Sequence, residues 1–448
     1  MRTRLILTIS LLLCGLAFAE ADTDVYIRGI EIYGNKTTHP KILKHFFEFN
    51  EGEALDTAKL RQTRANLLAT QLYDKVDIFP HMREDGAHIF IILKESLRLS
   101  LGYGGVYSTV RHGQEDLWYS FNFDVGIDNF RGRFEELRVG VEFWERRSLN
   151  ASWYKPLLST PYFISFGAGV SAYPAYVLPM DYLDVYARAT GGIKLGRYSR
   201  LSISAIPTYR GRTLLESLVD SATVIPLSFQ SDIYEAFAAL AYSIDRRNAR
   251  FNPRSGWYCA AQLRTNRLYS GVNTPYFQLS SEFRGYLPFG EDVASLRLLH
   301  TLRDRDAGAY HRLVYGGPGE IRGYSDDAVG WEFVANSAVL ASLKYHKQLY
   351  KTPTVPFKPA GLLFGVDKVT FKFDATFIAD YALLSRKPLG TLTLGGPWQD
   401  GMGIGLGTRV VVPEVRQSAC MDLVFGRIDD DDGSRWAPAL HMYLDLFF

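Results

Sequence analysis

Apolar and polar residues alternate along most of this chain, from Leu97 to its last residue. Successive side chains of a β-strand point to opposite faces of the sheet, so each alternating stretch predicts a strand with one apolar and one polar face. Gly, Pro, Asp and Asn stand between the stretches, as they do in turns. The clearest examples are DLWYSFNFDVG (116–126), ELRVGVEFW (136–144), YFQLSSEFRGY (276–286), SLRLLHTLR (295–303) and VTFKFDATFIAD (369–380).

Two all-β architectures produce this alternation. A soluble sandwich turns the apolar face inward, whereas an outer-membrane barrel turns it outward against lipid. The last segment, PALHMYLDLFF, favours the barrel because it resembles the terminal strand by which bacterial outer-membrane barrels are recognised for insertion. In that signal we expect Leu444, Leu446 and Phe448 to take part. A strand with its loop takes about 22 residues, so the 351 residues from 98 to 448 predict about sixteen transmembrane strands.

Residues 24–96 follow a different pattern and are expected to form a separate small α+β domain. An alternating stretch predicts a first strand, and two segments with apolar residues at helical spacing follow it. Two more strands are predicted at 76–79 and 88–93, joined by a hairpin at Asp85-Gly86. This order of strand, helix, helix, strand and strand resembles a POTRA domain, which is a periplasmic module.

The first 19 residues have the features of a secretory signal peptide. Arg2 and Arg4 precede an apolar run, and small residues at 17–19 predict cleavage before Glu20. No later run of 18 or more apolar residues predicts a transmembrane helix. Export without such a helix leaves two alternatives, a soluble secreted protein or a transmembrane β-barrel.

Charge and motif content exclude several other function classes. A formal net charge of +2 gives no reason to expect nucleic-acid binding. The chain has no HExxH, paired CxxC, GxSxG or P-loop motif, so we expect no enzyme, no cofactor and no metal site. GMGIGLG at 401–407 is interpreted as a glycine-lined strand face that eases close packing, and the acidic run at 429–432 as a solvated loop.

A POTRA-like module followed by a large barrel resembles the BamA/TamA superfamily, also called the bacterial surface antigen family. The resemblance covers essentially the whole mature chain, with a POTRA domain at 24–96 and a transmembrane barrel at 98–448. In the barrel it is carried by DNFRGRFEELRV (128–139), WYKPLLSTPYF (153–163) and DRRNARFNPRSGWYCAAQL (245–263).

The most specific match to the family is GGPGEIRGY, which contains Ile321-Arg322-Gly323-Tyr324. The resemblance implies that this segment is the tip of the long sixth extracellular loop, folded back into the barrel lumen. A guanidinium at Arg322 can pair bidentately with a carboxylate on the inner wall. Gly323 permits a tight turn, and Tyr324 adds packing area and a hydroxyl group.

The resemblance also implies an acid for Arg322 on a lumen-facing strand, in a stretch like F-x-x-D-x-G. FIADYA aligns Asp380 with that acid, which makes Asp380 the first candidate partner and Asp374 the second. Period two turns both aspartates and Lys372 toward the lumen. The alternate residues, expected to face lipid, are Val369, Phe371, Phe373, Ala375, Phe377 and Ala379.

The sequence departs from the family at two nearby positions. Where the family often has glutamate in a stretch like A-S-L-E-F, this chain has Lys344. A lumen-facing lysine there is expected either to repel Arg322 or to pair with one of the two aspartates. The family's glycine two places after the acid is replaced by Ala382.

The function implied by the resemblance is assembly, insertion or translocation of polypeptides at the bacterial outer membrane, with the POTRA domain in the periplasm. Expected partners are outer-membrane lipids, unfolded outer-membrane or secreted polypeptides, and periplasmic accessory proteins. The POTRA strand edge formed by Val76, Asp77, Ile78 and Phe79 is expected to bind clients by β-augmentation. A dedicated two-partner-type secretion pore and a lipid-transport barrel are the alternatives.

Overall fold

A computed structural model describes most of the chain, in two compact units at Met1–Ser96 and Leu97–Phe448. The described residues are 25–70, 72–96, 98–108, 118–144, 147–157, 160–174, 180–196, 198–214, 232–249, 252–270, 275–305, 313–314, 321–323, 334–360, 366, 368–385, 399–415, 417–430 and 433–444. The predicted signal peptide and three predicted site residues, Tyr324, Leu446 and Phe448, lie outside these ranges. The backbone of Leu444 ends the last described strand.

The first unit is a three-stranded sheet with helices, in the predicted order. Strand β1 pairs parallel to β3, and β3 pairs antiparallel to β2, which leaves β1 and β2 as the two edges. Helix α3 begins where the sequence predicts, because the Asp56 side chain accepts a hydrogen bond from the Ala58 N–H at 2.7 Å. The elements are β1 (Ile27–Tyr33), α2 (Pro40–Leu43), η1 (Lys44–Phe46), α3 (Thr57–Ala69), β2 (Tyr73–Arg83) and β3 (Gly86–Glu95).

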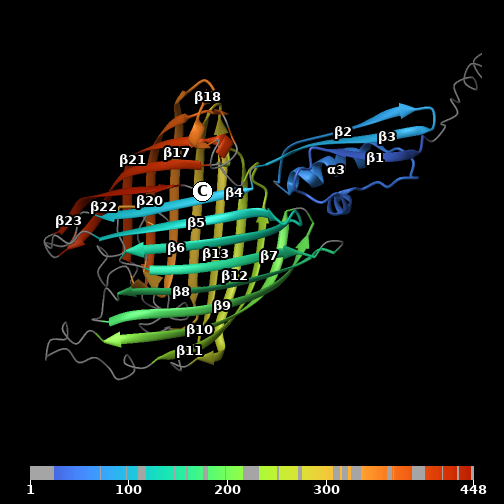
Figure 1. Ribbon diagram of the computed structural model, residues 1–448. Helices are drawn as coiled ribbons and strands as arrows, with labels where there is room; N and C mark the ends of the chain where they lie inside the picture. Colours follow the sequence, from blue (N-terminus) through green and yellow to red (C-terminus); the bar gives the residue numbers. More distant parts are fainter. Residues whose placement is uncertain are drawn as a thin grey trace, which may run out of the picture. The chain divides into compact units, whose positions relative to one another are not determined.

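The second unit is a closed antiparallel barrel to which the described residues contribute sixteen strands (Figure 1). The last strand, β23, pairs with the first, β4, and so closes the sheet. The alternating pattern and the chain length therefore predicted this architecture and its size correctly. The barrel strands are β4 (Leu99–Ser108), β5 (Trp118–Phe130), β6 (Glu135–Trp144), β7 (Arg147–Pro156), β8 (Tyr162–Pro174), β9 (Met180–Leu195), β10 (Ser199–Leu214), β11 (Ile233–Asp245), β12 (Gly256–Ser270), β13 (Phe277–Phe289), β14 (Asp292–Arg303), β17 (Ser337–Lys351), β20 (Lys372–Ser385), β21 (Gln399–Val412), β22 (Gln417–Asp430) and β23 (Gly433–Leu444).

Apolar side chains lie on the outside of the barrel and polar ones on the inside. On β20, Phe373 is 38% exposed and Phe377 51% exposed, whereas Asp380 is buried. This alternation fits an outward face in contact with lipid and an inner face that surrounds the lumen. Among the described residues, no helix is both long and apolar enough to cross a membrane.

Two residues expected to face lipid do not do so. Val369 is fully buried, and Phe371 packs against the cluster of Ala360, Val369 and Val415. The expectation was wrong because the alternation of β20 was extended beyond its first residue, Lys372. Upstream of that residue the chain forms a small separate sheet of β18 (Val355–Pro356) and β19 (Lys368–Val369).

Candidate functional site: a loop tip bound to the inner wall

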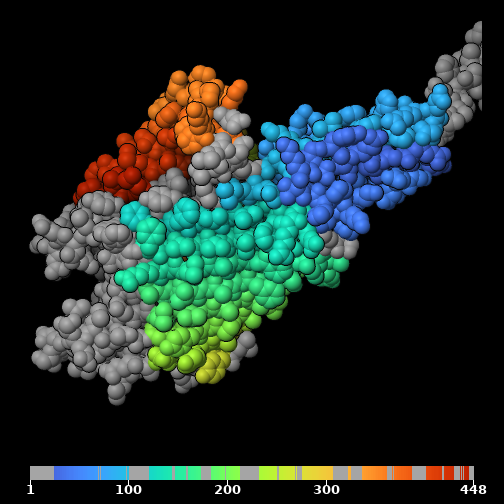
Figure 2. Space-filling view, in the orientation of Figure 1, coloured from blue at the N-terminus to red at the C-terminus, as the bar shows by residue number. Residues whose placement is uncertain are grey.

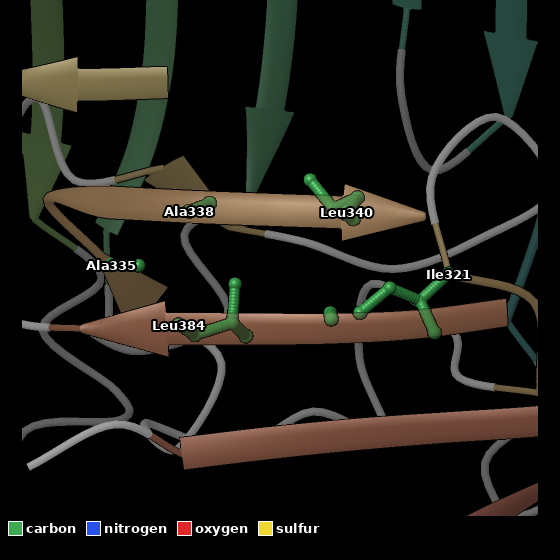
Figure 3. Packing of buried hydrophobic residues seen from close by; sticks show 6 residues of the cluster. Ile321, Ala335, Ala338, Leu340 and Leu384 are labelled. Atoms are coloured by element: carbon green, nitrogen blue, oxygen red, sulfur yellow. The ribbon is translucent and has the colours of Figure 1, made fainter. Parts of the chain in front are cut away.

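Residues 321–323 form the centre of a buried site inside the barrel unit. They belong to the long connection between β14 and β17, and all three are buried. The Ile321 side chain packs into a cluster with residues of β17 and β20 (Figure 3). That cluster consists of Ile321, Ala335, Ala338, Leu340, Ala382 and Leu384. The apolar contact holds the tip against the wall and excludes water from its neighbour Arg322.

Arg322 makes a bidentate ion pair with Asp380 of β20. Its Nε donates to Asp380 Oδ2 at 2.7 Å, its Nη2 donates to Oδ1 at 2.5 Å, and its backbone N–H donates to Oδ2 at 2.9 Å. Both side chains are about 1% exposed. A charge pair this deeply buried is tolerated because its bidentate geometry is good, and losing one partner is costly.

Two further side chains on the wall meet the same guanidinium. Nη2 of Arg322 donates to Ser342 Oγ of β17 at 2.7 Å, and Nη1 lies 3.8 Å from Asp422 Oδ2 of β22. Asp422 is 1% exposed, so its charge is also buried. Arg322 therefore connects three strands of the wall, β17, β20 and β22.

Gly323 turns the chain away from the wall and adds a fourth strand to the contacts. Its φ of 93° lies in the left-handed region, where a Cβ is strained. A Cβ at Gly323 would also lie 2.8 Å from the backbone nitrogen of Gly426 on β22. The Gly323 N–H donates to Nε2 of His441 on β23 at 3.1 Å, and His441 is fully buried. Only glycine fits this position without displacing the tip.

The glycines of GMGIGLG form the part of the wall on which the tip rests. A Cβ built on Gly403 of β21 would lie 2.1 Å from the Arg322 carbonyl oxygen, and one on Gly407 would lie 2.0 Å from Asp422 Oδ1. The intervening residues Ile404 and Leu406 are 44% and 59% exposed, on the outer face. The interpretation of this stretch as a close-packing strand face therefore agrees with its place in the structure.

Of the other two residues expected near Arg322, Asp374 lies far along β20, whereas Lys344 is two residues from Ser342 on the same face of β17. Asp374 is opposite Arg409 of β21 in the register, six residues before Asp380, which is about 20 Å along a strand. Lys344 is 3% exposed and lines a cavity with Ser342, Arg284 and Arg297. Neither Asp374 nor Lys344 bonds to Arg322.

In the first unit, β2 is an edge strand that carries the four predicted client-binding residues. The Val76 side chain is fully buried and Phe79 is 43% exposed, so their side chains differ in accessibility. The Val76 carbonyl accepts a 2.7 Å bond from Arg64 Nε, which indicates that it points away from β3. By alternation the backbone groups of Ile78 and Pro80 point the same way, and proline has no N–H to donate.

Sequence reasoning missed three members of the site, namely Ser342, Asp422 and His441. Asp422 and His441 each stand on the polar side of an alternating strand, at positions where apolar neighbours face lipid. Asp422 and His441 are also paired directly across β22 and β23. The alternation of side chains therefore predicts that both residues face the lumen. It does not predict how far along the barrel axis each residue lies, and so it does not place them beside Arg322.

Two family models match the chain over these two units. One, the Omp85 superfamily domain, matches residues 129–407, and the other, the surface antigen variable number repeat (POTRA), matches residues 25–96. The first covers more than half of the 448 residues. None of the curated protein sequences compared with the chain matches it.

Solved structures with the same fold are similar over nearly the whole chain. BamA from Haemophilus ducreyi lacking POTRA domains 1–3 has a TM-score of 0.58 at 16% identity, covering 95% of this chain and 85% of that one. CdiB from Escherichia coli has a TM-score of 0.61 at 12% identity, covering 94% and 76%. CdiB from Acinetobacter baumannii has a TM-score of 0.58 at 12% identity, covering 94% and 73%. The chain therefore belongs to the Omp85 superfamily, as an outer-membrane β-barrel protein with a POTRA domain on the periplasmic side.

Proposed function

We propose that this protein inserts or translocates polypeptides at the bacterial outer membrane without covalent chemistry. Its clients are unfolded outer-membrane or secreted polypeptides, delivered with or without periplasmic accessory proteins. Membership of the Omp85 superfamily supports this function. The observation that carries it is the seam between β4 and β23, together with the loop tip bound beside it.

The seam is short compared with the other strand pairs of the barrel. Among the described residues, β23 pairs with β4 at three positions, His441–Val106, Met442–Gly105 and Tyr443–Gly104. By contrast, β20 pairs with β21 at thirteen positions. Few ladder hydrogen bonds need to break at this seam, and each broken bond exposes backbone groups that can pair with an incoming strand. A client strand therefore has a place at which to enter the wall.

The loop tip is bonded to one side of this seam. Arg322 and Gly323 contact β17, β20, β22 and β23, and β23 is the seam strand itself. His441 links the two features, because it accepts the Gly323 N–H and is also one of the three seam positions. In the proposed mechanism the bound tip keeps the C-terminal wall rigid while the seam opens on its β4 side.

Locking the seam tests this mechanism. Gly105→Cys and Met442→Cys, in a background with Cys259 and Cys420 replaced by alanine, place two thiols at opposed positions. Oxidation is expected to abolish client insertion, and reduction is expected to restore it. The readout is the amount of folded client barrel in cells, recognised by a gel mobility that changes on heating. The matched control is Ile203→Cys with Leu240→Cys, an outward-facing pair in the complete β10–β11 ladder. Full activity of the oxidised seam variant would contradict the proposed opening.

Depletion of the protein distinguishes this function from its alternatives. Loss of many outer-membrane barrels from the proteome is expected for an assembly factor. Loss of a single secreted protein would instead identify a dedicated secretion pore. An unchanged proteome with altered membrane lipids would favour lipid transport.

The POTRA edge is the proposed first contact of a client. Since the Val76 carbonyl already bonds to Arg64 and Pro80 lacks an N–H, the backbone of Ile78 is the main pairing point on this edge. Ile78→Pro removes its outward N–H and is expected to lower crosslinking of an unfolded client to β2 several-fold. Ile78→Ala keeps the N–H and is expected to retain crosslinking. Equal loss in both variants would mean that the side chain, not the edge, binds clients.

A further inference from the structure

Arg264 lies on the inner face of the barrel, in the wall formed by strands β9 to β14. It alternates along β12 with Leu263, which is 42% exposed on the outer face, so the arginine side chain points inward. Its guanidinium packs over the ring of Phe237 on β11, with Cζ 3.8 Å from the ring centroid. Its Nε is buried and has no hydrogen-bond partner among the described residues. Figure 2 shows the outer face of the nearby strands β9 and β10 in green, which is the side opposite to the one that Arg264 faces.

Aromatic and aliphatic side chains surround this guanidinium. Ile206 of β10, Phe237 and Tyr276 form a buried cluster, and Tyr186 of β9 packs against it. The rings of Phe237 and Tyr276 meet edge to face, with centroids 6.5 Å apart. A cation beside such a surface is poorly solvated, and its contact with a ring leaves the N–H donors unsatisfied. The position of Arg264 therefore costs free energy in the folded protein.

A second arginine, Arg188 of β9, lies on the other side of the same cluster. The register of β9 with β10 places Arg188 opposite Ile206, and Ile206 is opposite Phe237 on β11. Arg188 and Arg264 therefore flank the same two apolar residues. Neighbouring strands are about 4.8 Å apart, so both arginine side chains can reach a group that is bound over Ile206 and Phe237. In the described part of the chain, no ion pair joins either arginine to an acid.

The acids that face this cluster have other partners. Asp184 accepts two hydrogen bonds from Arg210, at 2.6 and 2.8 Å. Glu235 accepts a hydrogen bond from Nδ2 of Asn266 at 2.9 Å. The charged residues around the cluster, counted over the described ranges, are Asp184 and Glu235 together with Arg188, Arg210, Arg264 and Arg303. Four arginines against two acids leave this surface positive, which favours an anionic ligand.

We propose that this surface binds a carboxylate of an acidic peptide inside the barrel. Arg264 and Arg188 pair with the carboxylate oxygens, and the rings of Phe237 and Tyr186 pack against apolar atoms of the peptide. The apolar cluster favours a peptide over a free inorganic anion, because a small hydrated ion gains nothing from contact with rings. The choice of a peptide rests on the proposed function, in which the ligands of the barrel are polypeptides.

The test measures the binding of two short peptides to the full-length protein in phosphatidylcholine nanodiscs, by isothermal titration calorimetry. One peptide is acetyl-Gly-Glu-Phe-Glu-Gly-amide, and the other has glutamine in place of both glutamates. The wild-type protein is expected to bind the glutamate peptide about tenfold more tightly, and Arg264→Gln is expected to reduce this preference to about twofold. The matched control is Arg200→Gln, which removes an exposed inward charge from β10, six residues and about 20 Å from Ile206. The control is expected to keep the wild-type preference.

Stability distinguishes a binding residue from a structural one at this position. Arg264→Met keeps an apolar side chain over Phe237 but removes the unsatisfied cation. Without peptide, this variant is expected to unfold at a urea midpoint equal to or above that of the wild-type protein. A lower midpoint would mean that the arginine stabilises the wall, and it would contradict the proposal.

Three binding results would also overturn the proposal. One is equal affinity of the wild-type protein for the two peptides. Another is an equal loss of preference in Arg264→Gln and Arg200→Gln, which would indicate the general charge of the wall. The third is full displacement of the glutamate peptide by inorganic phosphate at the same concentration, which would indicate a site for a free anion. The seam-locking experiment is independent, since an active locked seam would contradict the proposed function and leave the peptide preference unchanged.

Discussion

Replacing Arg322 with alanine is expected to destabilise the barrel by about 3–5 kcal/mol, since it leaves the Asp380 carboxylate buried without its partner. Asp422, which lies 3.8 Å from the guanidinium, loses favourable interaction as well. The lost side-chain contacts loosen the loop tip from three strands, β17, β20 and β22. The shift is measured as a lower urea midpoint for unfolding of the reconstituted barrel, followed by tryptophan fluorescence.

A double variant separates the ion pair from the packing of the tip. Arg322→Met with Asp380→Leu replaces both charges by apolar side chains and is expected to recover most of the lost stability. If Arg322→Ala unfolds at the wild-type midpoint, the ion pair does not hold the tip. If the double variant is as unstable as the single one, an uncompensated charge is not the cause.

Client insertion, measured in the same two Arg322 variants, separates the role of the ion pair in activity from its role in stability. The double variant restores a neutral wall but not the bidentate bond that fixes the tip. Client insertion is therefore expected to fall in both variants, while most of the loss in stability is confined to the single variant. Recovery of insertion in the double variant would show that stability alone explains the loss.

Substituting Gly403 with alanine is expected to displace the loop tip without changing any charge. The new Cβ would stand 2.1 Å from the Arg322 carbonyl oxygen, a distance at which backbone must move. Overpacking of this kind costs about 1–3 kcal/mol. The displacement is measured as faster proteolysis within the loop and as a lower unfolding midpoint.

Gly191→Ala provides the matched control for Gly403→Ala. Gly191 lies on β9 of the same barrel, and a Cβ built there meets nothing within 4 Å. It is expected to leave proteolysis and stability at wild-type values. Equal behaviour of the two alanine variants would show that the tip does not rest on β21.

The sequence predicted the barrel and the POTRA elements well because both depend on local patterns. Alternation with period two reports directly which face of a strand meets lipid, and helical spacing with the Asp56 cap reports the α3 helix. The same reasoning failed at Val369 and Phe371, where the strand had not yet begun. Alternation predicts which face of a strand a side chain lies on, but it does not predict the residue at which the strand begins.

The neighbours of Arg322 were harder to predict because they depend on register. Asp380 was reached through a family motif, whereas Asp422 and His441 come from strands aligned with it only in the folded barrel. The register of two paired strands depends on the length of the turn between them and on all of their pairings together. No single stretch of sequence therefore predicts it. For the same reason Asp374 and Asp380 look equivalent by alternation, yet they lie about 20 Å apart along β20.

The bonds of the loop tip also bear on the order in which the barrel forms. Arg322 reaches Asp380 across 58 residues, and Gly323 reaches His441 across 118 residues. The seam joins positions near the two ends of the barrel sequence, so its loop closure is the longest of all. Contacts between sequence-near segments form earlier than those between distant ones. The C-terminal strands can therefore assemble around the arginine as one folding unit, and the β4–β23 seam closes last.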